Sequence, residues 1–121
     1  MPGSAWEVEF TDQFEEWWLS LTEEEQESIV ASVEFLQEHG PALGRPFVER
    51  IKSSRHPNMK ELIPRGGHLS VLFAFDPRRM AILLIGGDKR DRWDRFYEEM
   101  VPVADDLYDQ HLAQLAGEGW R

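Results

Sequence analysis

The sequence predicts an α+β domain whose elements follow in the order β-α-α-β-β-β-α. Apolar residues alternate with acidic ones near the N-terminus, which is strand spacing, and recur every three or four residues in the next thirty positions and again from residue 91, which is helical spacing. Between these stretches, three short apolar runs are separated by turn residues, as in an antiparallel sheet. The 121 residues contain no repeat and no linker, so we expect one domain spanning 1–121.

The first strand and the first helix are predicted from adjacent signals. Trp6, Val8 and Phe10 alternate with glutamates, which is typical of a half-buried strand. Thr11 can accept a hydrogen bond from the first turn of a short helix and so cap it. The helix would bury one face, formed by Phe14, Trp17, Trp18 and Leu21.

A second helix follows and completes a two-helix hairpin. Thr22 and Glu25 have the spacing of a capping box, in which each side chain bonds the other residue's main chain. Apolar residues then recur at helical spacing, at Ile29, Val30, Val33 and Leu36. Gly40 and Pro41 end this helix.

The middle of the chain predicts an irregular connection and then the sheet. The segment Pro41–Pro57 is rich in Pro, Gly, Ser and Arg, so we expect a long loop that carries Phe47 and Ile51 inward. Three strands follow, over Met59–Ile63, Leu69–Phe75 and Met80–Ile85, joined by turns short enough for antiparallel hairpins.

The remaining residues predict the end of the sheet and a C-terminal helix. Gly86, Gly87 and Asp88 are expected to terminate the last strand. Asp91 can open a helix with a long apolar stripe, and Pro102 inside that stripe is expected to kink or split the helix.

Several classes of protein and site are excluded or lack support. The chain has no cysteine, which excludes disulfides and thiolate sites, and 41% hydrophobic content is too high for a disordered chain. No glycine-rich phosphate loop or zinc-protease motif is present, and the four histidines lack ligand spacing, so we predict no metal and no cofactor. Without a targeting segment or an apolar run of membrane-spanning length, we expect a cytoplasmic protein with no membrane partner.

The charges are segregated along the chain. The formal net charge is −10, but residues 1–40 contain eleven acidic residues and no Lys or Arg, whereas residues 41–95 contain twelve Lys or Arg and six acidic residues. Such asymmetry within one domain favours a basic surface for an acidic partner. Lys and Arg side chains at the predicted strand ends could bind the charged phosphate of a phosphodiester. RNA is cleaved without metal when its own 2′-hydroxyl attacks the adjacent phosphate.

Three segments then carry a family resemblance. The runs Lys60-Glu61-Leu62-Ile63-Pro64-Arg65, Val71-Leu72-Phe73-Ala74-Phe75 and Gly86-Gly87-Asp88-Lys89, followed by Trp93 and Phe96-Tyr97, resemble the phage-derived HigB-like branch of the RelE/ParE type II toxin superfamily. The resemblance covers residues 6–115. It implies a RelE-like fold, a cognate helix-turn-helix antitoxin as partner, and cleavage of mRNA, commonly on the ribosome.

The resemblance also implies site residues. The catalytic positions would be Lys60, Glu61, Arg65, Lys89, Arg90 and Tyr97, with Glu61 as a candidate general base. The RNA-binding positions would be Arg55, His56, His68, Arg92, Trp93 and Arg95. The family pattern expects an Arg before the second strand's apolar run, where this chain has Ser70.

The departure at Ser70 leaves alternatives open. The best reading is a metal-independent endoribonuclease toxin that cleaves mRNA and thereby inhibits translation. The same fold can also act without catalysis, as a ParE-like inhibitor of DNA gyrase or as an inactive relative that retains only antitoxin binding.

Overall fold

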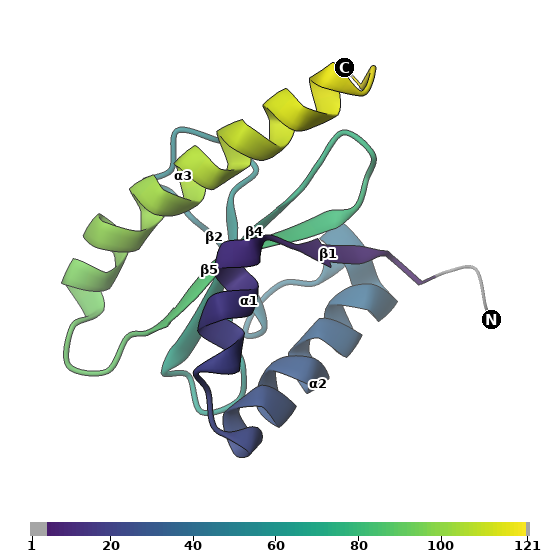
Figure 1. The fold of residues 1–121 in the computed structure, drawn as a ribbon. Coiled ribbons are helices and arrows are strands. Elements are labelled where there is room, and N and C mark those ends of the chain that lie inside the picture. Colours follow the sequence, from purple (N-terminus) through teal and green to yellow (C-terminus); the bar gives the residue numbers. More distant parts are fainter. Residues whose placement is uncertain (1–4, 121) are drawn as a thin grey trace.

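A sheet of five strands lies between two layers of helices (Figure 1). The computed structural model describes residues 5–120. The elements are β1 (Val8–Phe10), α1 (Asp12–Leu19), α2 (Glu23–His39), a 3-10 turn η1 (Gly40–Ala42), β2 (Val48–Arg50), β3 (Lys60–Leu62), β4 (Leu69–Phe75), β5 (Ala81–Asp88) and α3 (Trp93–Gly117). The strand order is β1-β5-β4-β3-β2, and the predicted α+β class is confirmed.

Both predicted helix starts in the N-terminal hairpin are confirmed. The side chain of Thr11 accepts a hydrogen bond from the main-chain N–H of Phe14 at 3.0 Å, which caps α1. Thr22 and Glu25 form the predicted reciprocal capping box of α2, at 2.9 and 3.1 Å. These local bonds fix where each helix begins and therefore how the hairpin leaves the sheet.

The sheet differs from the prediction at both edges. β1 runs parallel to β5, so the sheet is mixed, whereas all other pairs are antiparallel. Part of the predicted loop forms the edge strand β2. Of the two side chains expected to point inward, Ile51 is buried, but the prediction is wrong for Phe47, which is exposed. A three-residue strand has too little pattern to be recognised, because its stability comes from pairing with β3 rather than from its own residues.

Two further boundaries were predicted wrongly. β5 continues through Gly86, Gly87 and Asp88, which pair with β4 rather than ending the sheet. The last helix begins at Trp93 and passes through Pro102 without a break. Pro102 is exposed, so its ring faces solvent and disturbs no packed contact. Because proline has no main-chain N–H, the helix lacks one internal hydrogen bond at this position.

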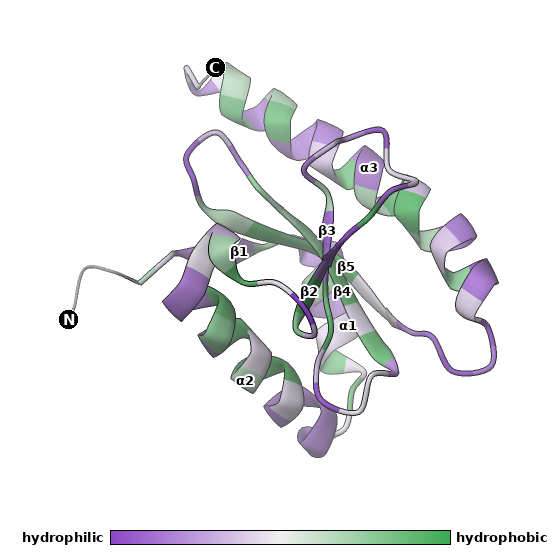
Figure 2. Cartoon of the chain, turned by 180° about the vertical axis from the view of Figure 1, so that it is seen from behind, coloured by the Kyte–Doolittle hydropathy of each residue, from purple (hydrophilic) through white to green (hydrophobic). Residues whose placement is uncertain are grey.

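Helices cover the sheet on both faces. Alternate residues of β4 divide between two cores: Val71 and Phe73 pack with α1 and α2, whereas Leu72 and Ala74 pack against α3. Figure 2 shows the matching stripes of hydrophobic and hydrophilic residues along α2 and α3. Among the described residues no helix combines the length and the apolar character that a membrane crossing requires.

Candidate functional site

Three of the predicted catalytic side chains meet in one buried cluster on the α3 face of the sheet. The ammonium Nζ of Lys89 lies 2.8 Å from Oε2 of Glu61. The hydroxyl of Tyr97 lies 2.9 Å from both carboxylate oxygens of Glu61 and 3.4 Å from Nζ of Lys89. One carboxylate therefore holds an ammonium and a phenol, which is a complete acid, base and cation set.

Strand alternation explains why these side chains converge. Glu61 is opposite Leu72 in the ladder between β3 and β4, so its side chain shares the α3 face with Leu72. Lys89 follows β5, where its main-chain N–H donates to the carbonyl of His68 at 2.7 Å and holds the chain beside β4. Tyr97 is on the second turn of α3, which lies directly over this end of the sheet.

The ion pair of the cluster is closed from solvent, whereas Tyr97 is half-buried. The Lys89 and Glu61 side chains retain 2% and 5% of their exposure, and Nζ of Lys89 lies 4.4 Å from the centre of the Trp93 ring. Burial, reinforced by the charge of Glu61, raises the pKa of Tyr97 well above its usual value of 10.0. Tyr97 is therefore a neutral phenol whose hydroxyl donates a hydrogen bond to Glu61.

Ser70 lies on the same face and has no hydrogen-bond partner. It is fully buried, and its Oγ is an unpaired polar atom among the described residues. It pairs with Gly87, where an added Cβ would come 2.6 Å from Phe96. The position at which the family pattern expects Arg is thus buried beside Gly87, close to the start of α3.

The other predicted catalytic residues lie outside the cluster. Lys60 points to the opposite face, where its Nζ lies 5.6 Å from the centre of the Phe75 ring and burial lowers its pKa. Arg65 is exposed in the turn after β3. Arg90 is exposed and binds both carboxylate oxygens of Asp88, at 2.5 to 3.2 Å. Adjacent residues of a strand face opposite sides, so Lys60 and Glu61 cannot share one site.

Most of the predicted RNA-binding residues are paired with acidic groups on α3. Arg55 binds Asp106 and Asp109, and these hydrogen bonds raise the pKa of Arg55. His56 lies 2.7 Å from Asp109, far along α3 from the cluster. Arg92 and Arg95 both pair with Glu99. Only Trp93 lies against the cluster.

The basic middle segment is therefore largely neutralised within the fold. Within residues 5–120, the bases that form no ion pair with another described residue are Arg50, Lys52, Lys60, Arg65 and Arg79. Sequence position alone could not identify them, because several of the paired bases meet acidic residues that are distant in the sequence, on α3, β1 and β3.

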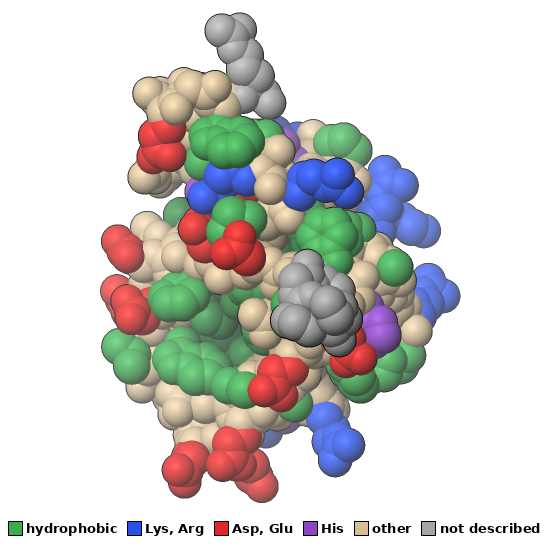
Figure 3. All heavy atoms as spheres, turned by 90° about the vertical axis from the view of Figure 1, so that its right-hand side faces the viewer, with side chains coloured by type: hydrophobic (Ala, Val, Ile, Leu, Met, Phe, Trp, Pro, Cys, Tyr) green, Lys and Arg blue, Asp and Glu red, His purple; other side chains and the backbone are tan. Residues whose placement is uncertain are grey.

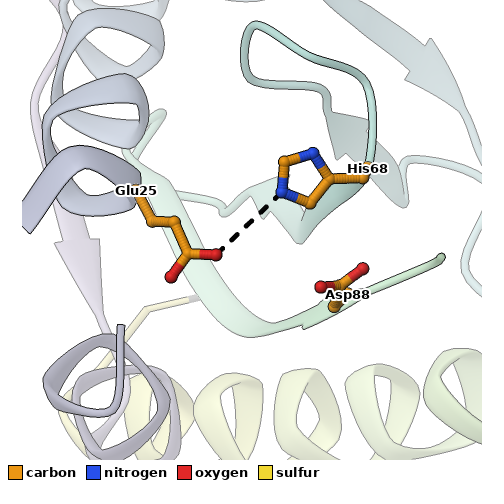
Figure 4. Close-up of side chains that lie close together, drawn as sticks. All are labelled: Glu25, His68 and Asp88. Carbon is orange, nitrogen blue, oxygen red and sulfur yellow. Dashed lines mark ion pairs between the residues drawn. The ribbon is translucent and has the colours of Figure 1, made fainter. Parts of the chain in front are cut away.

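A second group of titratable side chains lies where α2 meets the sheet. Glu25, His68 and Asp88 place one ligand atom each within 4.8 Å of one another (Figure 4). Nε2 of His68 is 4.0 Å from Oε2 of Glu25, but the other oxygen of Glu25 is used in the capping box. Arg90 occupies both oxygens of Asp88 and lowers its pKa, so a cation would have to displace a guanidinium there.

Comparison with known proteins finds one matching protein family, two sequence relatives and several solved structures of similar fold. The family model "Phage derived protein Gp49-like (DUF891)" matches residues 16–109. "Putative toxin HigB3" of Mycobacterium tuberculosis is 43% identical over 107 residues, which are 88% of this chain and 94% of the relative. "Putative toxin HigB2" of the same organism is 45% identical over 102 residues, or 82% of this chain and 51% of the longer relative.

Solved structures share the fold at low sequence identity. The isolated Escherichia coli RelE toxin aligns with a TM-score of 0.59 and 10% identity, over 79% of this chain and 99% of that one. RelE in the antitoxin–toxin complex of Methanococcus jannaschii aligns with a TM-score of 0.56 and 17% identity, over 74% and 99%. The element order and sheet therefore match the RelE fold.

Proposed function

The chain belongs to the family of phage-derived Gp49-like proteins, and from that premise we propose that it acts as the toxin of a RelE/HigB-type toxin–antitoxin pair. Its relatives in Mycobacterium tuberculosis are named as HigB toxins. Several RelE proteins of the same fold were solved in complex with antitoxins, which supports an antitoxin as the partner of this chain too. The partner expected here is a helix-turn-helix protein encoded beside the toxin.

The chemistry proposed for the toxin is cleavage of mRNA in the cytoplasm by attack of the RNA's own 2′-hydroxyl on the adjacent phosphate. The observation that carries this proposal is the cluster of Glu61, Lys89 and Tyr97. Glu61 accepts the proton of the 2′-hydroxyl, Lys89 stabilises the charge of the five-coordinate phosphorus, and Tyr97 donates its proton to the departing 5′-oxygen. The products are a 2′,3′-cyclic phosphate and a 5′-hydroxyl.

Access to the cluster sets a condition on this mechanism. Lys89 and Glu61 are closed off beneath Trp93 and the first turns of α3. RNA reaches them only if Trp93 and the rest of the first turn of α3 move away from the sheet, which also opens space beside Ser70, while Tyr97 on the second turn keeps its contact with Glu61. We propose that docking on the ribosome supplies the energy for that opening.

The two tyrosines of the chain provide a matched test. Tyr97→Phe removes the hydroxyl that contacts Glu61. Tyr108 lies in the other half of α3, and Tyr108→Phe removes a hydroxyl that contacts Asn58 and Phe75. In a translating extract, Tyr97→Phe should reduce mRNA cleavage by about 100-fold, the usual contribution of a general acid, and Tyr108→Phe should leave the rate unchanged. Intact mRNA with the unsubstituted protein, or 3′-hydroxyl products, would contradict the mechanism.

The same burial also favours a non-catalytic alternative. The ammonium of Lys89 is already neutralised by Glu61, and the position that the family pattern assigns to Arg is the enclosed Ser70. A ParE-like inhibitor of DNA gyrase, or a relative that only binds its antitoxin, would need no open cluster. A supercoiling assay with purified gyrase, run beside the mRNA assay, separates these functions.

A further inference from the structure

An apolar groove lies on the face opposite to α3, between β1, α1 and α2. It has a volume of about 410 Å³. Figure 3 shows it as a hollow lined by hydrophobic side chains and bordered by acidic ones, with the Lys and Arg side chains of that view lying away from it. Its lining includes the apolar side chains of Phe10, Leu19 and Val30 and the acidic side chains of Glu15 and Glu34.

The walls of the groove are apolar side chains that the fold leaves uncovered. Phe10 is 55% exposed, Leu19 71% and Val30 46%. The three come from three different elements, β1, α1 and α2, and converge on one hollow rather than being scattered over the surface. A contiguous apolar patch of this kind marks an interaction site.

The charge around the groove selects the kind of partner. Glu15 and Glu34 line it, and residues 1–40, which supply β1, α1 and α2, contain eleven acidic residues and no Lys or Arg. A basic partner is therefore attracted to this surface. A second copy of this chain would bring the same acidic surface against itself and be repelled.

The edge of the sheet offers main-chain hydrogen bonds beside the same hollow. The carbonyl of Glu7 and the N–H of Thr11 bond to β5, so in a parallel ladder the main chain of Val8 and Phe10 faces away from the sheet. β1 has no strand on that side within the described residues. An extended segment placed there would pair with β1 and direct every second side chain into the groove.

We propose that this groove binds a short basic segment of the antitoxin, in extended conformation along β1, with apolar side chains inserted between α1 and α2. The proposal rests on the proposed toxin function for the identity of the partner. The groove and the Glu61 cluster lie on opposite faces of the sheet. Binding there leaves the cluster uncovered, so any inhibition acts through the fold or through the bulk of the antitoxin.

The test uses the full-length toxin and the helix-turn-helix protein encoded by the adjacent reading frame, both purified. Leu19→Glu combined with Val30→Glu places charge on two exposed walls of the groove, and Val103→Glu, an exposed apolar position on α3, is the control. The double variant should weaken binding of that protein at least tenfold, and the control should not. Glu15→Lys with Glu34→Lys should weaken binding more at low salt than at high salt, unlike Glu16→Lys with Glu38→Lys.

The outcomes separate this inference from the proposed function. Unchanged affinity in both groove variants, or no binding of the adjacent protein by the unsubstituted toxin, would overturn the groove assignment even if mRNA is cleaved. Specific loss of binding would support it even if no mRNA is cleaved. If the free protein is a dimer that Leu19→Glu and Val30→Glu dissociate, the occupant is a second copy and the proposal is wrong. Sedimentation of the free variants distinguishes this case.

Discussion

Ser70 presents the sharpest question at the level of single residues, because its buried hydroxyl has given up water without gaining a partner. An unpaired buried hydroxyl costs about 1–3 kcal/mol of desolvation. Ser70→Ala removes this group and keeps the volume of the side chain nearly unchanged. We expect the free energy of unfolding in urea to stay the same or to rise by about 1 kcal/mol. A decrease of that size would mean that Ser70 has a partner in solution, such as a bound water.

Asp76 determines the acid sensitivity of the fold. Its side chain is buried, and although burial alone would raise its pKa, hydrogen bonds from Arg78 and His111 lower it below 3.8. Ionised Asp76 therefore stabilises the native state above pH 4, and this contribution is lost as the pH falls through the lowered pKa. Arg78 also binds Glu9, so the network ties the β4–β5 turn to β1 and α3.

Substitution of Asp76 should reveal this contribution. At pH 7, Asp76→Asn should lower the free energy of unfolding by about 3 kcal/mol, because it leaves Arg78 partly unpaired. The difference between the variant and the unsubstituted protein should narrow as the pH falls from 4 toward 2. Glu16→Gln, an exposed position on α1, is the control. A difference that is independent of pH would show that lost packing, not ionisation, causes the effect.

At the level of elements, two glycines set how closely the helices approach β5. A Cβ on Gly86 would lie 2.2 Å from the Trp17 ring of α1, and one on Gly87 would lie 2.6 Å from the Phe96 ring of α3. These glycines were expected to end the strand, but they lie inside it and allow a helix to pack on each face. They therefore fix the position of α3 over the Glu61 cluster.

Gly86→Ala and Gly87→Ala should each destabilise the fold by about 1–3 kcal/mol, because the added methyl group overpacks a well-filled interface. Gly44→Ala is the control, since no atom lies within 4 Å of a Cβ there. Urea unfolding measures all three. If Gly87→Ala is tolerated without loss, α3 can shift from the sheet at little cost, and opening of the cluster would need no docking energy.

The elements that were predicted correctly are those with local signals. Two helix starts are predicted by capping residues close to them in sequence, Thr11, Thr22 and Glu25. The central strands β4 and β5 are predicted by their apolar runs. The parallel pairing of β1 with β5 joins residues about 70 positions apart, so no local pattern carries it. The ion pair of Glu61 with Lys89 has the same origin, because it forms only when β3 and the end of β5 lie on either side of β4.

At the level of the whole molecule, the charge distribution predicts how RNA reaches the cluster. The net charge is −10, and most bases of the middle segment are paired with acids. Affinity for free RNA comes mainly from unpaired Lys and Arg that displace counterions. Here the acidic α1 and α2 repel a long RNA, so its attraction from a distance is weak.

The same transcript should therefore be cleaved at least tenfold faster while it is translated than as naked RNA at the same concentration, because the ribosome replaces the missing long-range attraction. Neutralising the acidic start of α2, with Glu23→Gln, Glu24→Gln and Glu27→Gln, should raise binding of naked RNA at 50 mM salt and have little effect at 300 mM, where charges are screened. Cleavage rates on naked and translated transcript measure the first effect, and filter binding measures the second. Equal rates on both transcripts would mean that the unpaired bases Arg50, Lys52, Lys60, Arg65 and Arg79 capture RNA without a ribosome.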